Sequence, residues 1–144
     1  MLGRVLRVKK KSDVSFSVYN HYNHRLAAVC AFRDSINNQQ VADDVAMHVA
    51  TMKPDYLRWS DVDAKVLQQE RTILTQQLQQ DPKIRQKPQA IVDRIIAGRM
   101  KKTLGQRILT SQSFVLNQEQ TVAQLLQEHH LDMVSFVRLS VDES

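Results

Sequence analysis

The chain has 144 residues, of which 42% are hydrophobic and 24% charged, as in one ordinary soluble domain. Its single cysteine excludes an intramolecular disulfide, and no apolar run approaches the roughly 20 residues that span a bilayer. The net charge of +5 favours acidic partners, either nucleic acid or the negative surface of another protein.

Two segments near the N-terminus have strand patterns, and residues 5–8 fit a further edge strand. Residues 14–18 alternate apolar side chains with serines, which is typical of a strand with one buried face. Residues 26–32 are almost wholly apolar, which predicts a second and more buried strand. The connection at residues 20–24 contains two asparagines, which tolerate left-handed backbone. We therefore expect a β-hairpin.

Helical spacing begins near residue 38. Apolar residues then recur every three or four positions until Lys53-Pro54, where proline ends the helix. A second helix is expected from a cap at Ser60 or Asp61 to about Gln80. A third should begin at Pro88, which suits the first turn of a helix, and end at a cap on Gly105. Both have narrow apolar stripes and a short loop joins them, so they should form an antiparallel helical hairpin that projects from the body.

The C-terminal segment combines a helix with a strand. Asn117 followed by Gln120 resembles a capping box, which predicts that a helix begins there. Residues 134–141 alternate, with Val137, Leu139 and Val141 on one face of a third strand. The expected fold class is α+β: a small antiparallel β-sheet with packed helices and an inserted helical, coiled-coil hairpin. We assign residues 1–57 and 105–144 to the core and residues 58–104 to the hairpin.

No catalytic, cofactor or metal site is recognisable in the sequence. His21 and His24 have a metal-pair spacing, but no cysteine cluster or acidic ligand near them completes a tetrahedral site. His48, on an apolar helical face, is expected to be a hydrogen-bonded packing residue. Cys30 lies within an apolar strand, where a thiol has a raised pKa and is a poor nucleophile. The glycines are isolated and fit neither a P-loop nor a dinucleotide motif. We expect no enzyme and no bound cofactor.

The basic residues support nucleic-acid binding only weakly. They gather at residues 9–11 and 99–102, without exposed aromatic residues interleaved among them. A small basic RNA-binding module therefore stays as the alternative interpretation.

Several segments share a family pattern in order and spacing. Residues 45–54 (V-A-M-H-V-A-T-M-K-P) are similar to I-A-M-H-V-A-x-x-K-P, and residues 98–105 (G-R-M-K-K-T-L-G) to G-R-M-K-K-F-x-G. Residues 112–115 (Q-S-F-V), 121–126 (T-V-A-Q-L-L) and 136–139 (F-V-R-L) are similar to Q-P-F-V, T-V-x-Q-L-L and F-x-R-F. Over about residues 16–141, the chain resembles the elongation factor Ts family.

The resemblance implies a cytoplasmic translation factor that binds elongation factor Tu and promotes GDP/GTP exchange without binding nucleotide itself. The implied partner-binding residues are His21, in a Y-x-H pattern, and Phe114, Val115 and Leu116, in and after the Q-P-F segment. Core packing is an equal alternative for Val115 and a weaker one for Leu116. The chain is expected to make no membrane contact.

Two family segments do not occur in these 144 residues: the T-D-F-V exchange wedge and the M-D-C-K sequence of the N-terminal module. Both would precede Met1, so the chain is expected to be either a fragment or a shortened relative. The resemblance implies that it corresponds to the docking and dimerisation part of the factor, and we expect binding without exchange. Whether the chain is a monomer or a two-fold homodimer stays open.

Overall fold

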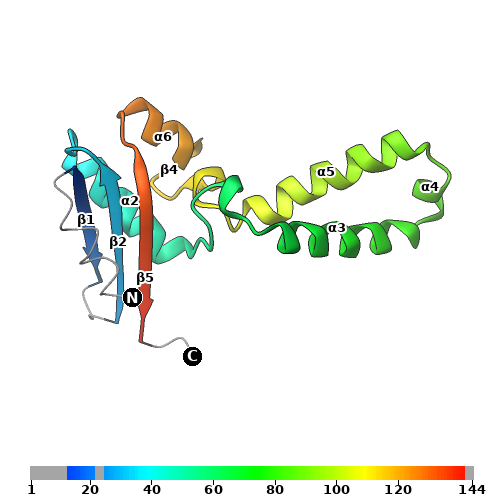
Figure 1. Cartoon of the computed structure of the whole chain (residues 1–144), viewed down its shortest axis with the longest axis horizontal. Coiled ribbons are helices and arrows are strands. Elements are labelled where there is room, and N and C mark those ends of the chain that lie inside the picture. The colour runs from blue at the N-terminus through cyan, green and yellow to red at the C-terminus, as the bar shows by residue number, and fades with distance from the viewer. Residues whose placement is uncertain (1–12, 22–24, 142–144) are drawn as a thin grey trace.

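Three antiparallel strands form the core sheet of the computed structural model, which describes residues 13–21 and 25–141. β2 (Leu26–Arg33) is the central strand, between β1 (Val14–Asn20) and β5 (Met133–Ser140) (Figure 1). The predicted α+β fold class is confirmed.

The predicted β-hairpin is also confirmed. β1 pairs with β2 over its whole length, and the His21 N–H donates to the Leu26 carbonyl at 2.9 Å beyond the last pair. The central strand is the more buried of the two, as its apolar sequence predicted. Residues 5–8, the predicted edge strand, and residues 22–24 of the connection lie outside the described residues.

Helix α2 (Gln39–Met52) packs against this sheet. It begins after Asn38, whose side chain accepts a hydrogen bond from the Val41 N–H at 3.2 Å. It ends at Lys53, which adopts a left-handed conformation with φ of 54°, one residue before Pro54. Because capping depends on residues close in sequence, both ends lie where the sequence predicted them.

The covered face of the first strand is the one that carries its serines. Its serines face α2: Ser17 is 1% exposed, and its hydroxyl donates to the Ala42 carbonyl at 2.8 Å. Val18 points to the opposite face and is 58% exposed. The register aligns Val18 with half-buried Val29 and Val137, so this opposite face carries a row of valines; we term it the open sheet face because no helix within residues 13–21 and 25–141 packs on it. Alternation with a period of two identifies a strand but not which of its faces is covered.

The C-terminal half adds a small ribbon and a helix to the core. β3 (Ser113–Phe114) pairs with β4 (Asn117–Thr121), and α6 (Val122–Glu128) follows directly. The capping box predicted at Asn117 is therefore wrong. Thr121 is the cap: its hydroxyl accepts from the Gln124 N–H at 3.2 Å, and the Gln124 side chain accepts from the Thr121 N–H at 2.9 Å.

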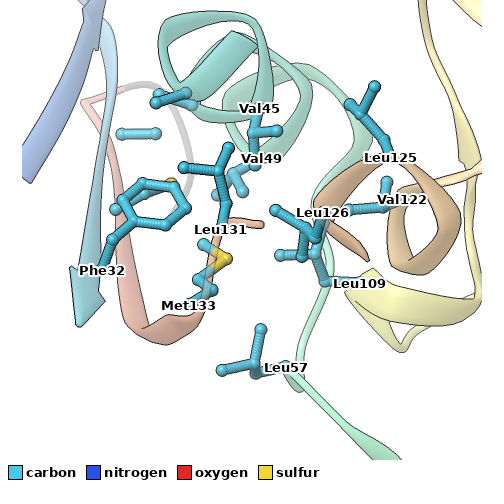
Figure 2. Close-up of a cluster of buried hydrophobic side chains, with 14 of the residues drawn as sticks. Phe32, Val45, Val49, Leu57, Leu109, Val122, Leu125, Leu126, Leu131 and Met133 are labelled. Carbon is cyan, nitrogen blue, oxygen red and sulfur yellow. The ribbon is translucent and has the colours of Figure 1, made fainter. Parts of the chain in front are cut away.

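A hydrophobic cluster joins these elements (Figure 2). Phe32 from β2 and Met133 from β5 meet Val45 and Val49 from α2, and all four are at most 1% exposed. The short helix η2 (Leu109–Ser111) and α6 complete the cluster from the other side, with Leu109, Val122, Leu125 and Leu126. The core thus lies between the sheet, α2 and α6.

The helical hairpin extends away from this core, as predicted (Figure 1). α3 (Ala64–Gln79) and α5 (Gln89–Gly105) run antiparallel, and α4 (Pro82–Arg85) lies in the turn between them. The facing side chains form a second buried cluster with these members: Leu74, Leu78, Ile96, Met100 and Leu104. This cluster reaches past the helices to Val62 and Ile108.

Two predicted ends of the hairpin helices are wrong. Ser60 and Asp61 belong to a short 3-10 turn, η1 (Trp59–Asp61), and α3 begins only after Asp63. Gly105 is the last residue of α5 and not a left-handed cap, since none of the described glycines has a positive φ. The predicted division of the chain at residues 57/58 and 104/105 stays a prediction.

The hairpin base, residues 55–56 and 107–109, joins the two segments that connect the hairpin to the core. The Asp55 N–H donates to the Arg107 carbonyl and the Leu109 N–H to the Tyr56 carbonyl, both at 2.8 Å. The Arg107 side chain donates to the Asp55 carboxylate at 2.7 Å and lies 5.5 Å from the Tyr56 ring centroid. The start and the end of the hairpin therefore lie side by side.

Candidate functional site

The predicted partner-binding segment forms the turn of the β3–β4 ribbon. Phe114 pairs with Asn117, so Val115 and Leu116 are the two turn residues. Two-residue turns favour glycine, asparagine and aspartate, whereas here both positions are apolar. Leu116 is 59% exposed, and Val115 is half-buried against the core cluster. This 115–116 turn therefore presents apolar surface where a polar residue would be expected.

A buried histidine holds the turn from beneath. The Val115 N–H donates to His48 Nδ1 at 3.1 Å, and His48 Nε2 lies 2.9 Å from Gln112 Oε1. The His48 side chain is completely buried, with its ring stacked on Phe114 at a centroid distance of 5.8 Å. The sequence-based prediction of a hydrogen-bonded packing histidine is confirmed.

These contacts fix the protonation state of His48. A backbone N–H can only donate, so Nδ1 must carry the lone pair and Nε2 the proton that is donated to Gln112. The ring is therefore neutral. Burial lowers the pKa of His48 below its ordinary value, and the hydrogen bond to Gln112 opposes that shift only in part. A second proton on Nδ1 would meet the Val115 N–H and break the bond to the turn.

Gln112 connects the turn to the ends of two helices. Its side-chain NH2 donates to the Gln106 carbonyl after α5 at 2.9 Å, and to the Met52 carbonyl at the end of α2 at 3.4 Å. Gln112 itself is 7% exposed. Every buried side-chain polar atom of the described residues has a partner, so the support beneath the turn is complete.

A pocket of about 580 Å³ opens beside the turn. Val115 and Met52 line it together with Lys101, Lys102 and Gln106. Met52 is 45% exposed, so it adds apolar surface next to the turn. The pocket lies where the ends of α2 and α5 meet the 112–115 segment, because Gln112 joins all three.

The predicted site residues differ in exposure and in their place in the fold. Leu116 is exposed and Val115 is half-buried, so both offer surface to a partner. Phe114 is 5% exposed within the core cluster, where its ring stacks on His48 beneath the turn. His21 follows β1, which packs against α2, the helix that carries His48 beneath the turn.

His21, directly after β1, is half-buried and contacts Tyr19 of that strand. The Tyr19 hydroxyl lies 2.8 Å from His21 Nδ1, and the two rings are 6.0 Å apart. Residues i and i+2 of a strand lie on one face, which brings these side chains together.

Other chemistry has little support in the described part of the chain. Within residues 13–21 and 25–141, no three metal-ligating side chains gather; His24 lies outside that part. No helix there is long and apolar enough to cross a membrane. Cys30 is buried, and burial raises its pKa to about 12, against a smaller opposing effect of the hydrogen bond with Ser17. The prediction of a buried thiol with a raised pKa is confirmed, and its low reactivity stays a prediction.

Sequence reasoning missed three features of this site. Lys101 and Lys102 lie in the basic stretch 99–102, which the sequence connects only with weak nucleic-acid binding, and Met52 lies within the helical spacing that ends at Lys53-Pro54. Gln112 was noted only within a motif, although its amide joins both helices to the turn. The apolar pair at a tight turn was the local signal that could have identified an exposed site.

Comparisons with known proteins agree with the resemblance in the sequence. A family model described as Elongation factor TS matches residues 1–143. A protein of Spiroplasma citri named Elongation factor Ts is 32% identical over 142 residues, covering 99% of this chain and 48% of the relative. Its namesake in Phytoplasma australiense is 34% identical over 140 residues, covering 97% of this chain and 50% of the relative. The chain spans about half the length of the curated relatives it matches. It belongs to the elongation factor Ts family.

Proposed function

We propose that this chain binds elongation factor Tu through the 115–116 turn. The observation that carries the proposal is the exposed Leu116 on a turn whose backbone is fixed by buried His48. A rigid support lowers the conformational entropy lost when the turn binds, so an exposed apolar residue there is suited to association. Half-buried Val115 and exposed Met52 extend the same apolar surface. The family supplies the identity of the partner.

We further propose that these 144 residues bind without accelerating nucleotide exchange. The T-D-F-V segment, which the family places against the Mg2+ region of the GTPase, does not occur in them. The chain would contribute docking and dimerisation, with no catalysis and no nucleotide or metal of its own. Its proposed place of action is the cytoplasm, as a translation elongation factor.

Release of fluorescent GDP from elongation factor Tu, with size-exclusion chromatography in parallel, tests both parts. Wild-type chain is expected to form a complex and leave the release rate unchanged. The double variant Val115→Asp with Leu116→Asp should lose the complex, since both carboxylates would have to be desolvated on binding. Ile73→Asp is the matched control, because Ile73 is 49% exposed on the helical hairpin. Equal binding by all three proteins would refute the assigned surface, and faster GDP release would refute the absence of exchange.

The RNA-binding alternative makes a different prediction. Binding through phosphate contacts releases counterions, so affinity would fall steeply as salt concentration rises. Failure to bind elongation factor Tu at low salt, together with salt-sensitive binding to RNA, would favour this alternative.

For self-association, we propose that the open sheet face pairs with a second copy. Val18, Val29 and Val137 form its central row, and Phe16 and Leu139 lie on the same face by register. Two such faces can pack as a sandwich about a two-fold axis. Sedimentation should show a dimer for wild-type chain and Ile73→Asp, and a monomer for Val18→Asp. A monomeric wild-type chain would refute this dimer. The open sheet face would then be available to another part of a longer protein.

A further inference from the structure

The pocket beside Val115 carries positive charge that no described ion pair neutralises. Lys101 and Lys102 line it, and no carboxylate does so among the described residues. Both lysines are exposed, and neither has an ion-pair partner within residues 13–21 and 25–141. The pocket therefore combines apolar walls from Met52 and Val115 with two ammonium groups that pair with none of the described carboxylates.

Helix ends account for only part of this charge. Cations are favoured at a helix C-terminus, where the aligned peptide dipoles correspond to about half a negative charge. Lys102 lies in the last turn of α5, and α2 ends at Met52 on the same pocket. Two such ends offset about one unit of the lysine charge. The Gln112 amide also donates to one carbonyl at each of these helix ends, Gln106 after α5 and Met52 of α2, so these two carbonyls already have a partner. About one positive charge is left facing the pocket.

Beyond the 115–116 turn, we propose that this pocket receives an acidic segment of the bound GTPase, with an apolar side chain against Met52 and Val115 and a carboxylate at Lys101 and Lys102. This rests on the proposed binding of elongation factor Tu and specifies the chemistry of the partner surface. Exposed charges at the rim of an interface act mainly on association rate and salt dependence, whereas the apolar contacts control dissociation.

Removing the two lysine charges separates their effect on the association rate from the effect of the apolar contacts on the dissociation rate. Lys101→Gln with Lys102→Gln keeps good helix formers at both positions and removes two charges. The matched control is Lys83→Gln with Lys87→Gln, which removes the same charge at the far end of the helical hairpin, where Lys83 also lies in a last helical turn. Stopped-flow binding to elongation factor Tu should show an association rate about three- to tenfold lower for the pocket variant only. Its salt dependence should be shallower and its dissociation rate within about twofold of wild type.

A zero-length carbodiimide cross-link provides a direct readout. The reagent joins a lysine amine to a carboxylate in contact with it, with loss of water. Mass spectrometry of the complex should find Lys101 or Lys102 linked to an aspartate or glutamate of elongation factor Tu. Thermal melting confirms that the pocket variant is folded.

The outcomes distinguish the two proposals. If wild-type chain does not bind elongation factor Tu, both fail. If it binds, but the pocket variant associates like the control and no such cross-link forms, only the acidic-segment proposal is overturned. Equal weakening by the pocket and control variants would also overturn it, because the effect would then come from net charge alone. Loss of RNA binding in the pocket variant, with binding to the GTPase unchanged, would assign the lysines to phosphate instead.

Discussion

Replacing His48 by phenylalanine removes both ring nitrogens while keeping a planar ring that can stack on Phe114. The change leaves Gln112 Oε1 and the Val115 N–H without their partners. An orphaned buried polar group costs about 1–3 kcal/mol. Gln112 is buried and Val115 is half-buried, so water can relieve only the second loss. We expect His48→Phe to lower the free energy of unfolding by about 2–4 kcal/mol.

Urea denaturation followed by circular dichroism measures this loss. His129→Phe is the control, because His129 lies at the C-terminal cap of α6 without this buried network, and it should change stability by less than about 0.5 kcal/mol. A double-mutant cycle with Gln112→Leu should give a coupling of about 1–3 kcal/mol, since the two side chains share a hydrogen bond. A loss below about 1 kcal/mol for His48→Phe, with no coupling, would refute the role given to these bonds.

Three further predictions follow from burial. Because burial holds the pKa of His48 below 6.5, the unfolded chain binds a proton there that the folded chain does not. The free energy of unfolding of the wild type should therefore fall as pH drops below about 6.5. Because His48→Phe lacks this titrating group, the difference in free energy of unfolding between the two proteins should become smaller at low pH. A difference that stays constant with pH would contradict this. Cys30, with a pKa of about 12, should resist a thiol reagent at pH 8 in the native state and react fully in urea; rapid native labelling would show that the strand opens. Leu78→Ala, at a site 2% exposed, should cost about 2–5 kcal/mol and lower hydrogen-exchange protection in α3 and α5 but not in β2. Uniform loss of protection would mean that the hairpin and the sheet unfold as one unit.

Local chemistry explains which elements could be predicted from the sequence. Asn38 and Lys53-Pro54 bound α2 through contacts within a few residues, so the helix lies where its caps predict. The polar sequence of β4 has no apolar alternation that would predict a strand. Asn117–Gln120 and Thr121–Gln124 carry the same capping signature, and only the pairing of β4 with β3 shows that the helix begins at the second. Which face of β1 is buried was likewise decided by α2, through contacts that no spacing along one strand encodes.

The candidate site was predictable only in part for the same reason. The resemblance supplied Val115 and Leu116, and the turn that exposes them is local. Met52, Lys101 and Val115 come from three distant stretches of sequence, and they share a pocket because Gln112 joins the helix ends beneath it. Such long-range proximity is not visible in periodicity.

The hairpin base has a consequence for the order of folding. β2 pairs with β5 across about a hundred intervening residues, a separation that slows closure of the sheet. Once α3 and α5 have packed locally, the base places Tyr56 next to Ile108 and shortens the effective loop by about half. The entropy saved is about 0.6 kcal/mol, or roughly threefold in rate. The folded helical hairpin thus shortens the loop that must close before β5 can pair with β2. Variants that unfold the hairpin should therefore slow the pairing of β5.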